Sequence, residues 1–304
     1  MASYNVLGEL TTFNEDETII THQYSRIKKI ENIEKCKKDI NRKKIKNKIK
    51  HKNLYIYIYI YIYIYIYIYI YTCISFFCRV LDLSFNKIKI IENLETLVNL
   101  EELYLSSNKI SKIENLQNCK KLRLLELGYN KIRMIENIEH LTNLEELWLG
   151  KNKIEQINLP YLPKLKKLSV QHNRLTDICE KSIKNILCVE ELYISYNKIN
   201  HIIDTFKDLK HLKVFDLSYN EINNISICSY LKSLEELWLN NNNIDNLEMI
   251  KKLSTIENLK TLYLEKNKIQ DNLKENYRKT IIHILPQLKQ LDALPIPSSP
   301  TLQK

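Results

Sequence analysis

The sequence predicts an α/β solenoid, in which the chain winds into stacked coils that share one parallel sheet. The first observation is an asparagine that returns every 21 to 25 residues along most of the chain. The second is that apolar residues stand five and three positions before each copy, and the third is another apolar residue two positions after it. A period of this length is typical of repeat architectures. The nine copies are Asn86, Asn108, Asn130, Asn152, Asn173, Asn197, Asn220, Asn242 and Asn267.

The copy around Asn108 shows how each repeat is expected to fold. Leu103 and Leu105 flank Tyr104, so both leucines face one side of a short strand and the tyrosine faces the other. The amide of Asn108 suits the following turn, because it satisfies backbone groups that no sheet ladder reaches. Ile110 then returns inward, and each coil needs neighbours to bury its apolar wall. This is the leucine-rich class of repeat, which predicts a right-handed superhelix with a parallel concave sheet, a short helical or irregular convex side and a C-terminal cap.

The segments that flank the repeats are expected to differ from them. Ile20 takes the Leu103 position in a degenerate first repeat, and the residues from Ile281 to Leu285 are apolar at helical spacing, which predicts a lid over the last apolar wall. The predicted segments are a flexible leader at 1–19, the degenerate repeat at 20–38, an insertion at 39–78, leucine-rich repeats at 79–268, the C-terminal cap at 269–292 and a disordered, proline-containing tail at 293–304.

The insertion at 39–78 interrupts one coil and has low complexity. After a basic run, tyrosine and isoleucine alternate from Tyr55 to Tyr71. Three interpretations stay open. The segment is a membrane span, because Leu54 to Cys78 is 25 uncharged residues long; or a β-prone loop; or a gene-model artefact, because a TA dinucleotide run translates as alternating tyrosine and isoleucine. Sequencing the transcript across residues 36 to 82 decides between them, since an mRNA that keeps all 40 codons excludes the artefact.

The composition excludes several classes of function. The net charge of +10 falls to +4 without the insertion, and this mild excess does not indicate nucleic acid. The three glycines are too far apart for a phosphate loop, and the seven histidines show no catalytic or metal-binding spacing, so we expect no enzyme activity, no cofactor and no metal. Seven unpatterned cysteines and the absence of a secretory signal at the start indicate reduced thiols in an intracellular protein, expected in the nucleus and cytoplasm.

The outward side of the strands is the candidate binding surface. Each coil is expected to present three side chains on this face, two beside the inward leucines and one between them. Over nine coils these positions hold eight acidic residues and one basic residue, with both tryptophans of the chain and three tyrosines. Acidic residues favour a basic partner, and large aromatic residues dominate binding hot spots. The alternative is that the aromatic residues only stabilise the strands by cross-strand packing.

A second row of charged residues follows the repeated asparagine. The next residue is lysine or arginine in seven of the nine coils, and we name this row the basic ridge. It is either a solvated flank or a surface for a second, acidic partner. Its members are Lys87, Lys109, Lys131, Lys153, Arg174, Lys198 and Lys268.

Three features of the repeats point to one family. They are the 22-residue period, the recurring Ile-Glu-Asn-Leu or Ile-Glu-Asn-Ile at 91–94, 113–116 and 135–138, and an ending in which Tyr277-Arg278 is followed by Leu-Pro and Leu-Asp. Together they resemble the family of protein phosphatase 1 regulatory subunit 7, over residues 20 to 292 apart from the insertion. Members of that family are non-catalytic and hold the phosphatase catalytic subunit on the concave face. The resemblance implies contact residues at Asp82, Tyr104, Glu126, Trp148, Asp216, Glu236, Trp238 and Tyr263.

The sequence therefore predicts a non-catalytic regulatory subunit, a monomeric solenoid that binds the catalytic subunit of protein phosphatase 1 through an acidic-aromatic concave face. No nucleic acid and no small-molecule substrate are expected, and a membrane only if the segment at 54–78 is real. The first alternative is another leucine-rich-repeat scaffold, of spliceosomal or ciliary type, which pull-downs of those assemblies would favour. The second is an enzyme, which activity in a purified chain free of phosphatase would support.

Overall fold

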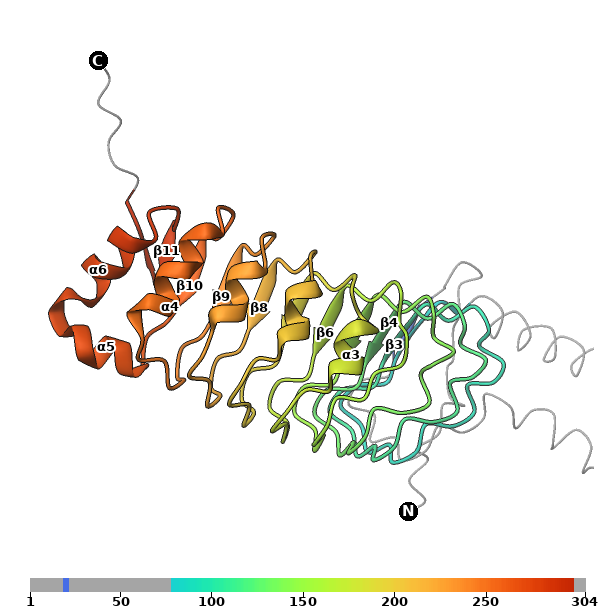
Figure 1. Cartoon of the computed structure of the whole chain (residues 1–304). Coiled ribbons are helices and arrows are strands. Elements are labelled where there is room, and N and C mark those ends of the chain that lie inside the picture. The colour runs from blue at the N-terminus through green and yellow to red at the C-terminus, as the bar shows by residue number, and fades with distance from the viewer. Residues whose placement is uncertain (1–18, 22–77, 298–304) are drawn as a thin grey trace, which may run out of the picture.

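The chain forms an open solenoid, seen in a computed structural model that describes residues 19–21 and 78–297 (Figure 1). Within these residues, strands follow one another in one sheet in the order of the sequence, and every neighbouring pair is parallel except the last. The predicted parallel solenoid is confirmed. The strands are β1 (Ile19–Thr21), β2 (Val80–Asp82), β3 (Glu102–Tyr104), β4 (Leu124–Glu126), β5 (Glu146–Trp148), β6 (Lys167–Ser169), β7 (Glu191–Tyr193), β8 (Val214–Asp216), β9 (Glu236–Trp238), β10 (Thr261–Tyr263), β11 (Gln290–Leu291) and β12 (Leu294–Pro295).

The strands pair in register, so equivalent residues of successive coils stack. Leu103 pairs with Leu81 on one side and with Leu125 on the other, and all three are fully buried. Ile110 and Ile132, which follow the repeated asparagines, are also fully buried in the same continuous core. Each such side chain contributes roughly 2 kcal/mol of burial, so the stack as a whole stabilises the coils.

The repeated asparagines form a ladder of hydrogen bonds inside the turns. The side-chain amide of Asn130 donates to the carbonyls of Leu105, Leu127 and Gly128 at 2.9, 3.0 and 3.1 Å. Its carbonyl oxygen accepts from the backbone N–H of Ile110 at 3.0 Å. The same set of bonds recurs at the other asparagines from Asn108 to Asn267. Each asparagine therefore joins its own coil to the coil before it.

The turn needs a left-handed residue immediately before each asparagine. Nine residues there have φ between 53° and 58°, and none is glycine. A left-handed conformation costs a non-glycine residue roughly 1 kcal/mol or more, and the asparagine ladder offsets this cost. They are Phe85, Ser107, Tyr129, Lys151, His172, Tyr196, Tyr219, Asn241 and Lys266.

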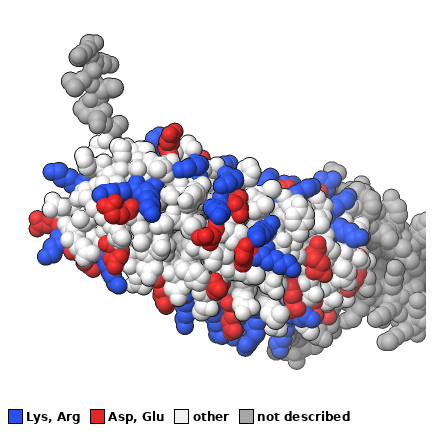
Figure 2. Space-filling view, viewed as in Figure 1, with Lys and Arg blue, Asp and Glu red and all other residues white. Residues whose placement is uncertain are grey.

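The side opposite the sheet carries short helical segments in the later coils and irregular chain in the earlier ones. The first of them lies between Asn173 and Asn197, where the spacing of the asparagines stretches to 24 residues. Figure 2, viewed from the same side as Figure 1, shows acidic and basic side chains interspersed over this side of the molecule. The segments are α3 (Glu180–Lys184), η1 (Asp204–Asp208), η2 (Ser226–Tyr230), α4 (Leu247–Lys252) and η3 (Leu253–Thr255), the η labels marking 3-10 helices.

The C-terminal cap consists of α5 (Lys268–Leu273), η4 (Lys274–Asn276), α6 (Tyr277–Ile284) and the antiparallel pair β11 and β12. Ile281 and Leu285 are fully buried against the last coils, as the helical spacing predicted.

The expectation of a disordered tail from residue 293 is wrong for residues 293–297. β12 covers the open edge of β11, and the N–H of Ile296 donates to the carbonyl of Lys289 at 2.7 Å. Pro295 is tolerated because an edge strand needs no N–H from it. Residues 298–304 lie outside the described part of the chain.

At the other end, β1 pairs with β2 so that Ile20 lies beside Leu81. This is the register that the assignment of Ile20 to the Leu103 position requires. The leader at 1–18 and residues 22–77, which hold the rest of the first repeat and nearly all of the insertion, lie outside the described residues. In the part that is described, no helix is long and apolar enough to span a bilayer.

Candidate functional site

The outward residues of β2 to β10 form one continuous surface, which we name the acidic-aromatic face. In most of these strands the middle residue is buried and the residues on either side are half-buried. The register divides the predicted contact residues into two groups on adjacent strands. The first group is Asp82, Tyr104, Glu126 and Trp148, and the second is Asp216, Glu236, Trp238 and Tyr263.

In four strands, a glutamate and an aromatic residue two positions later share this face and form a hydrogen bond. The hydroxyl of Tyr104 donates to Glu102 Oε2 at 2.8 Å, and the indole N–H of Trp148 donates to Glu146 Oε2 at 3.0 Å. The equivalent bonds are Tyr193 to Glu191 at 2.8 Å and Trp238 to Glu236 at 3.3 Å. Burial and the bonded carboxylate raise the pKa of Tyr104 and of Tyr193. Each ring and its glutamate therefore form one hydrogen-bonded unit. The sequence alone indicated only that the two residues share a face.

In three other strands an acidic residue takes the position of the ring. Its carboxylate accepts a hydrogen bond from the backbone N–H two residues later. The N–H of Ser84 donates to Asp82 Oδ1 at 2.9 Å, and the N–H of Gly128 donates to Glu126 Oε1 at 2.8 Å. Asp216 Oδ1 accepts from the N–H and the hydroxyl of Ser218 at 3.0 and 2.6 Å. Asp216 is only 4% exposed. Its carboxylate shapes the end of β8 and is not available as a direct contact, unlike the other seven predicted residues.

Glu126 lies between two aromatic residues, since its strand neighbours are Tyr104 and Trp148. Burial raises the pKa of its carboxyl to about 7, although the bond from the Gly128 N–H opposes the shift. Gly128 makes this position available, because a Cβ there would lie 2.6 Å from Glu126 Oε1. The charge of the face therefore changes near pH 7 at this residue.

We expect Glu126→Gln to stabilise the protein at pH 8 and to change its stability little at pH 5. The folded-state pKa of about 7 lies above the ordinary glutamate pKa of 4.5, so folding costs free energy once the carboxyl must ionise. The penalty appears as pH rises from 4.5 to 7, and glutamine escapes it while still accepting the Gly128 bond. The gain at pH 8 should be on the order of 2 kcal/mol after solvent screening. Urea unfolding at the two pH values measures it, and an equal gain at both would contradict the assignment.

The centre of the face differs from what the sequence predicted. Lys167, its one basic residue, lies between two carboxylates, with Nζ 3.7 Å from Glu146 Oε1 and 3.4 Å from Glu191 Oε1. Trp148 and Tyr193 stack above this strand with ring centroids 6.0 Å apart. Tyr193 therefore belongs with the candidate residues, and the signal for it was the Glu-Leu-Tyr pattern that it shares with Tyr104.

The second aromatic group lies at the C-terminal end of the face. The ring centroids of Trp238 and Tyr263 are 5.2 Å apart, and the ring planes are tilted by 54°. The hydroxyl of Tyr263 accepts a hydrogen bond from the side-chain amide of Gln290 at 2.8 Å. The described residues hold no cluster of three side chains able to bind a metal ion. What the face offers is a broad surface of half-exposed rings and carboxylates, and this arrangement suits recognition of a basic protein surface.

The fold and this surface define an open solenoid of stacked coils with a single parallel sheet. Family models described as leucine-rich repeats match residues 78–118, 120–161, 163–222 and 193–297. The chain therefore belongs to the leucine-rich-repeat family.

Among similar proteins are two named as regulatory subunits of protein phosphatase 1. SDS22 of Schizosaccharomyces pombe is 43% identical over 25% of this chain and 23% of its own length. The subunit pprA of Dictyostelium discoideum is 40% identical over 21% of this chain and 18% of its own length. The centrosomal protein of 72 kDa of Mus musculus is 35% identical over 34% of this chain and 16% of its own length. The chain thus spans less than a quarter of each of these relatives.

A solved structure gives the same fold. A leucine-rich-repeat protein of Leptospira interrogans superposes with a TM-score of 0.63 at 28% identity, covering 72% of this chain and 55% of that one.

Proposed function

We propose that this protein is a non-catalytic regulatory subunit that binds the catalytic subunit of protein phosphatase 1 through its acidic-aromatic face. The single observation that carries the proposal is the repeated unit of a half-exposed ring bonded to a glutamate two residues earlier, which occurs in four strands of the face. The partial likeness to two proteins named as regulatory subunits of that phosphatase supports the choice of partner.

The geometry supports a large, basic partner. Neighbouring strands lie about 4.8 Å apart, so nine strands give a surface roughly 40 Å long, which is the size of a protein interface. The carboxylates hold the rings by their N–H or O–H groups, so the rings lose little rotamer freedom when a partner binds. Glu126, Trp148 and Tyr193 lie toward the middle of this surface, where hot-spot residues concentrate. The nucleus and cytoplasm are the compartments we propose for the complex.

The double substitution Trp148→Ala and Trp238→Ala tests the proposal. Each ring is expected to contribute about 2 kcal/mol or more to binding, so the dissociation constant for the phosphatase catalytic subunit should rise by about 1000-fold or more. The matched control removes two exposed rings away from the face, Tyr161→Ala and Tyr230→Ala, which are 66% and 55% exposed. It should bind like the wild type.

Both variants should keep the circular dichroism spectrum of the wild type, because neither alters the buried core. Undiminished binding of the tryptophan variant would refute the site. A wild-type chain that binds no phosphatase, but recovers spliceosomal or ciliary assemblies in pull-downs, would refute the partner and favour another leucine-rich-repeat scaffold.

A further inference from the structure

The basic ridge is a row of charges of which most have no ion-pair partner among the described residues. Its residues in six consecutive coils, from Lys87 to Lys198, are exposed or half-exposed. Within the described residues, Arg174 lies 3.8 Å from Glu155, and none of the five lysines of this stretch lies within ion-pair distance of a carboxylate. Backbone hydrogen bonds attach the row to the preceding coils: the N–H of Lys109 donates to the carbonyl of Ile88, and the N–H of Lys131 to that of Ile110, both at 2.8 Å.

The opposite edge of the sheet shows that this arrangement is not a necessity of the fold. The residues just before the strands alternate strictly in sign over nine coils, and each of them forms an ion pair. The pairs are Arg79–Glu101 at 3.7 Å, Arg123–Glu145 at 2.9 Å, Lys166–Glu145 at 3.2 Å, Lys213–Glu190 at 2.6 Å and Lys260–Glu235 at 2.6 Å. Stacked like charges repel, so six basic residues in a row lower stability unless an anion neutralises them.

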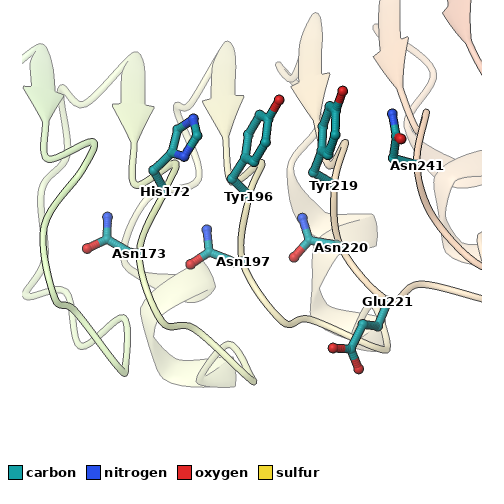
Figure 3. A pocket seen from close by; sticks show the side chains of 8 residues that line it. All are labelled: His172, Asn173, Tyr196, Asn197, Tyr219, Asn220, Glu221 and Asn241. Carbon is teal, nitrogen blue, oxygen red and sulfur yellow. The ribbon is translucent and has the colours of Figure 1, made fainter.

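A row of aromatic rings runs parallel to the ridge, on the other side of the repeated asparagines (Figure 3). The left-handed residues two positions before its members include Tyr129, His172 and Tyr196, and Tyr219 follows in the next coil, two positions before Glu221. The rings of His172, Tyr196 and Tyr219 stack with centroids 3.9 Å apart and planes within 11°, and Figure 3 shows them in one line above the row of asparagines. This line borders an open hollow of about 540 Å³ that ends at Glu221 and Asn241.

We infer that the basic ridge and the aromatic row form a second interaction surface, which binds an extended acidic peptide segment of a partner protein. The ridge from Lys87 to Lys198 spans about 24 Å at the spacing of stacked coils, which matches seven or eight residues of extended chain. The carboxylates of the segment lie over the ridge, and its backbone follows the edges of the rings. The row changes sign at Glu221, so the acidic stretch ends there.

An acidic peptide fits this surface better than a nucleic acid does. The acidic-aromatic face adjoins the same edge and repels a phosphate backbone, whereas a single extended peptide is narrow enough to stay on the ridge. The rings of His172, Tyr196 and Tyr219 are stacked on one another, so no gap is left for a base to stack between them.

The test is a variant that copies the pattern of the opposite edge. Lys109→Glu with Lys153→Glu makes the ridge alternate in sign from Lys87 to Arg174, so this variant should be at least as stable as the wild type in urea unfolding. Its affinity for a fluorescein-labelled decaglutamate peptide should nevertheless fall by about tenfold or more, measured by fluorescence anisotropy at low salt. The control Lys120→Glu with Lys210→Glu changes the net charge equally at exposed positions away from the ridge and should bind within about threefold of the wild type.

The basic run from Arg42 to Lys52 attracts the same peptide, and this background is common to all variants. A peptide with a photoreactive group at its centre therefore maps the site, and cross-links between Lys87 and Tyr219 are expected. Equal binding by the ridge variant and the control, no binding by the wild type, or cross-links confined to Arg42–Lys52 would each overturn the inference. Ridge-dependent binding of a labelled oligouridylate in place of the peptide would overturn it in favour of RNA.

The rings and the other face provide two further readouts. Tyr196→Asn with Tyr219→Asn keeps residues that tolerate left-handed φ and should weaken peptide binding severalfold. The variant Trp148→Ala with Trp238→Ala should bind the peptide like the wild type even where it has lost the phosphatase. Failure of this inference is thus distinguishable from failure of the proposed function.

Discussion

Replacing Asp292 with alanine is expected to lower the free energy of unfolding by about 4 kcal/mol. Within the stack, the backbone N–H groups that follow each strand donate to carbonyls of the next coil, as Leu239 does to Tyr263. The last full coil has no such neighbour, and Asp292 supplies the acceptor instead. Its Oδ1 accepts from the N–H groups of Leu264 and Glu265 at 2.8 and 2.9 Å, and its Oδ2 accepts from the hydroxyl of Tyr277 at 3.2 Å. Alanine leaves these donors without an acceptor, and it must also adopt the left-handed φ of 54°.

The matched control is Asp292→Asn, which keeps the acceptor oxygen for Leu264 and Glu265 and tolerates the left-handed backbone. It should cost about 1 kcal/mol, since it mainly removes the charge that Tyr277 bonds. Burial and Asp292 raise the pKa of Tyr277, so this hydroxyl remains a donor through the neutral range. Urea unfolding followed by circular dichroism measures both variants, and equal losses for alanine and asparagine would show that the carboxylate does not close the stack.

The core could be predicted from the sequence almost completely, because it depends on spacing alone. Leu103 and Leu105 alternate around an outward residue, and a three-residue strand allows only one assignment of faces. The role of Asn108 was also predictable, since a buried turn must satisfy its backbone groups and an asparagine amide has both a donor and an acceptor. The repeat then propagates one correct assignment along the whole described stack.

The site was less predictable, because its chemistry depends on side-chain direction. Residues two apart on a strand were known to share a face, yet only the structure shows that Glu146 accepts from the indole of Trp148. The same period placed Asp216 on that face, but its short side chain bends to Ser218 and is covered. The ion pairs at the opposite edge were not predicted, although the alternation from Arg79 to Lys260 can be read once the strand starts are known.

The left-handed turns were missed because the usual signal is absent. Glycine is the residue that sequence reasoning associates with positive φ, and the nine turns use aromatic, polar and basic residues instead. The aromatic row at Tyr129, Tyr196 and Tyr219 follows from this choice, since the left-handed backbone turns these side chains outward beside the basic ridge. The tail was mispredicted for a related reason, because Pro295 occupies an edge strand that needs no donor from it.

Replacing Asn130 with alanine should lower the free energy of unfolding by about 3 kcal/mol. The change leaves the N–H of Ile110 without its acceptor and withdraws a donor from the carbonyls of Leu105, Leu127 and Gly128, inside a turn where Asn130 is only 8% exposed. The control is Asn223→Ala, at an exposed asparagine for which a change of less than about 0.5 kcal/mol is expected.

The position of Asn130 in the stack also predicts how the variant unfolds. In a solenoid, each coil is stabilised by its neighbours, so a defect within the stack weakens one interface and divides the coils into two blocks. Amide hydrogen exchange should therefore accelerate most in the coils on either side of Asn130, whereas Asp292→Ala should accelerate it at the C-terminal coils alone. Uniform acceleration along the chain would mean that the coils unfold as one cooperative unit, and a loss no larger than that of Asn223→Ala would mean that the asparagine ladder contributes little to joining them.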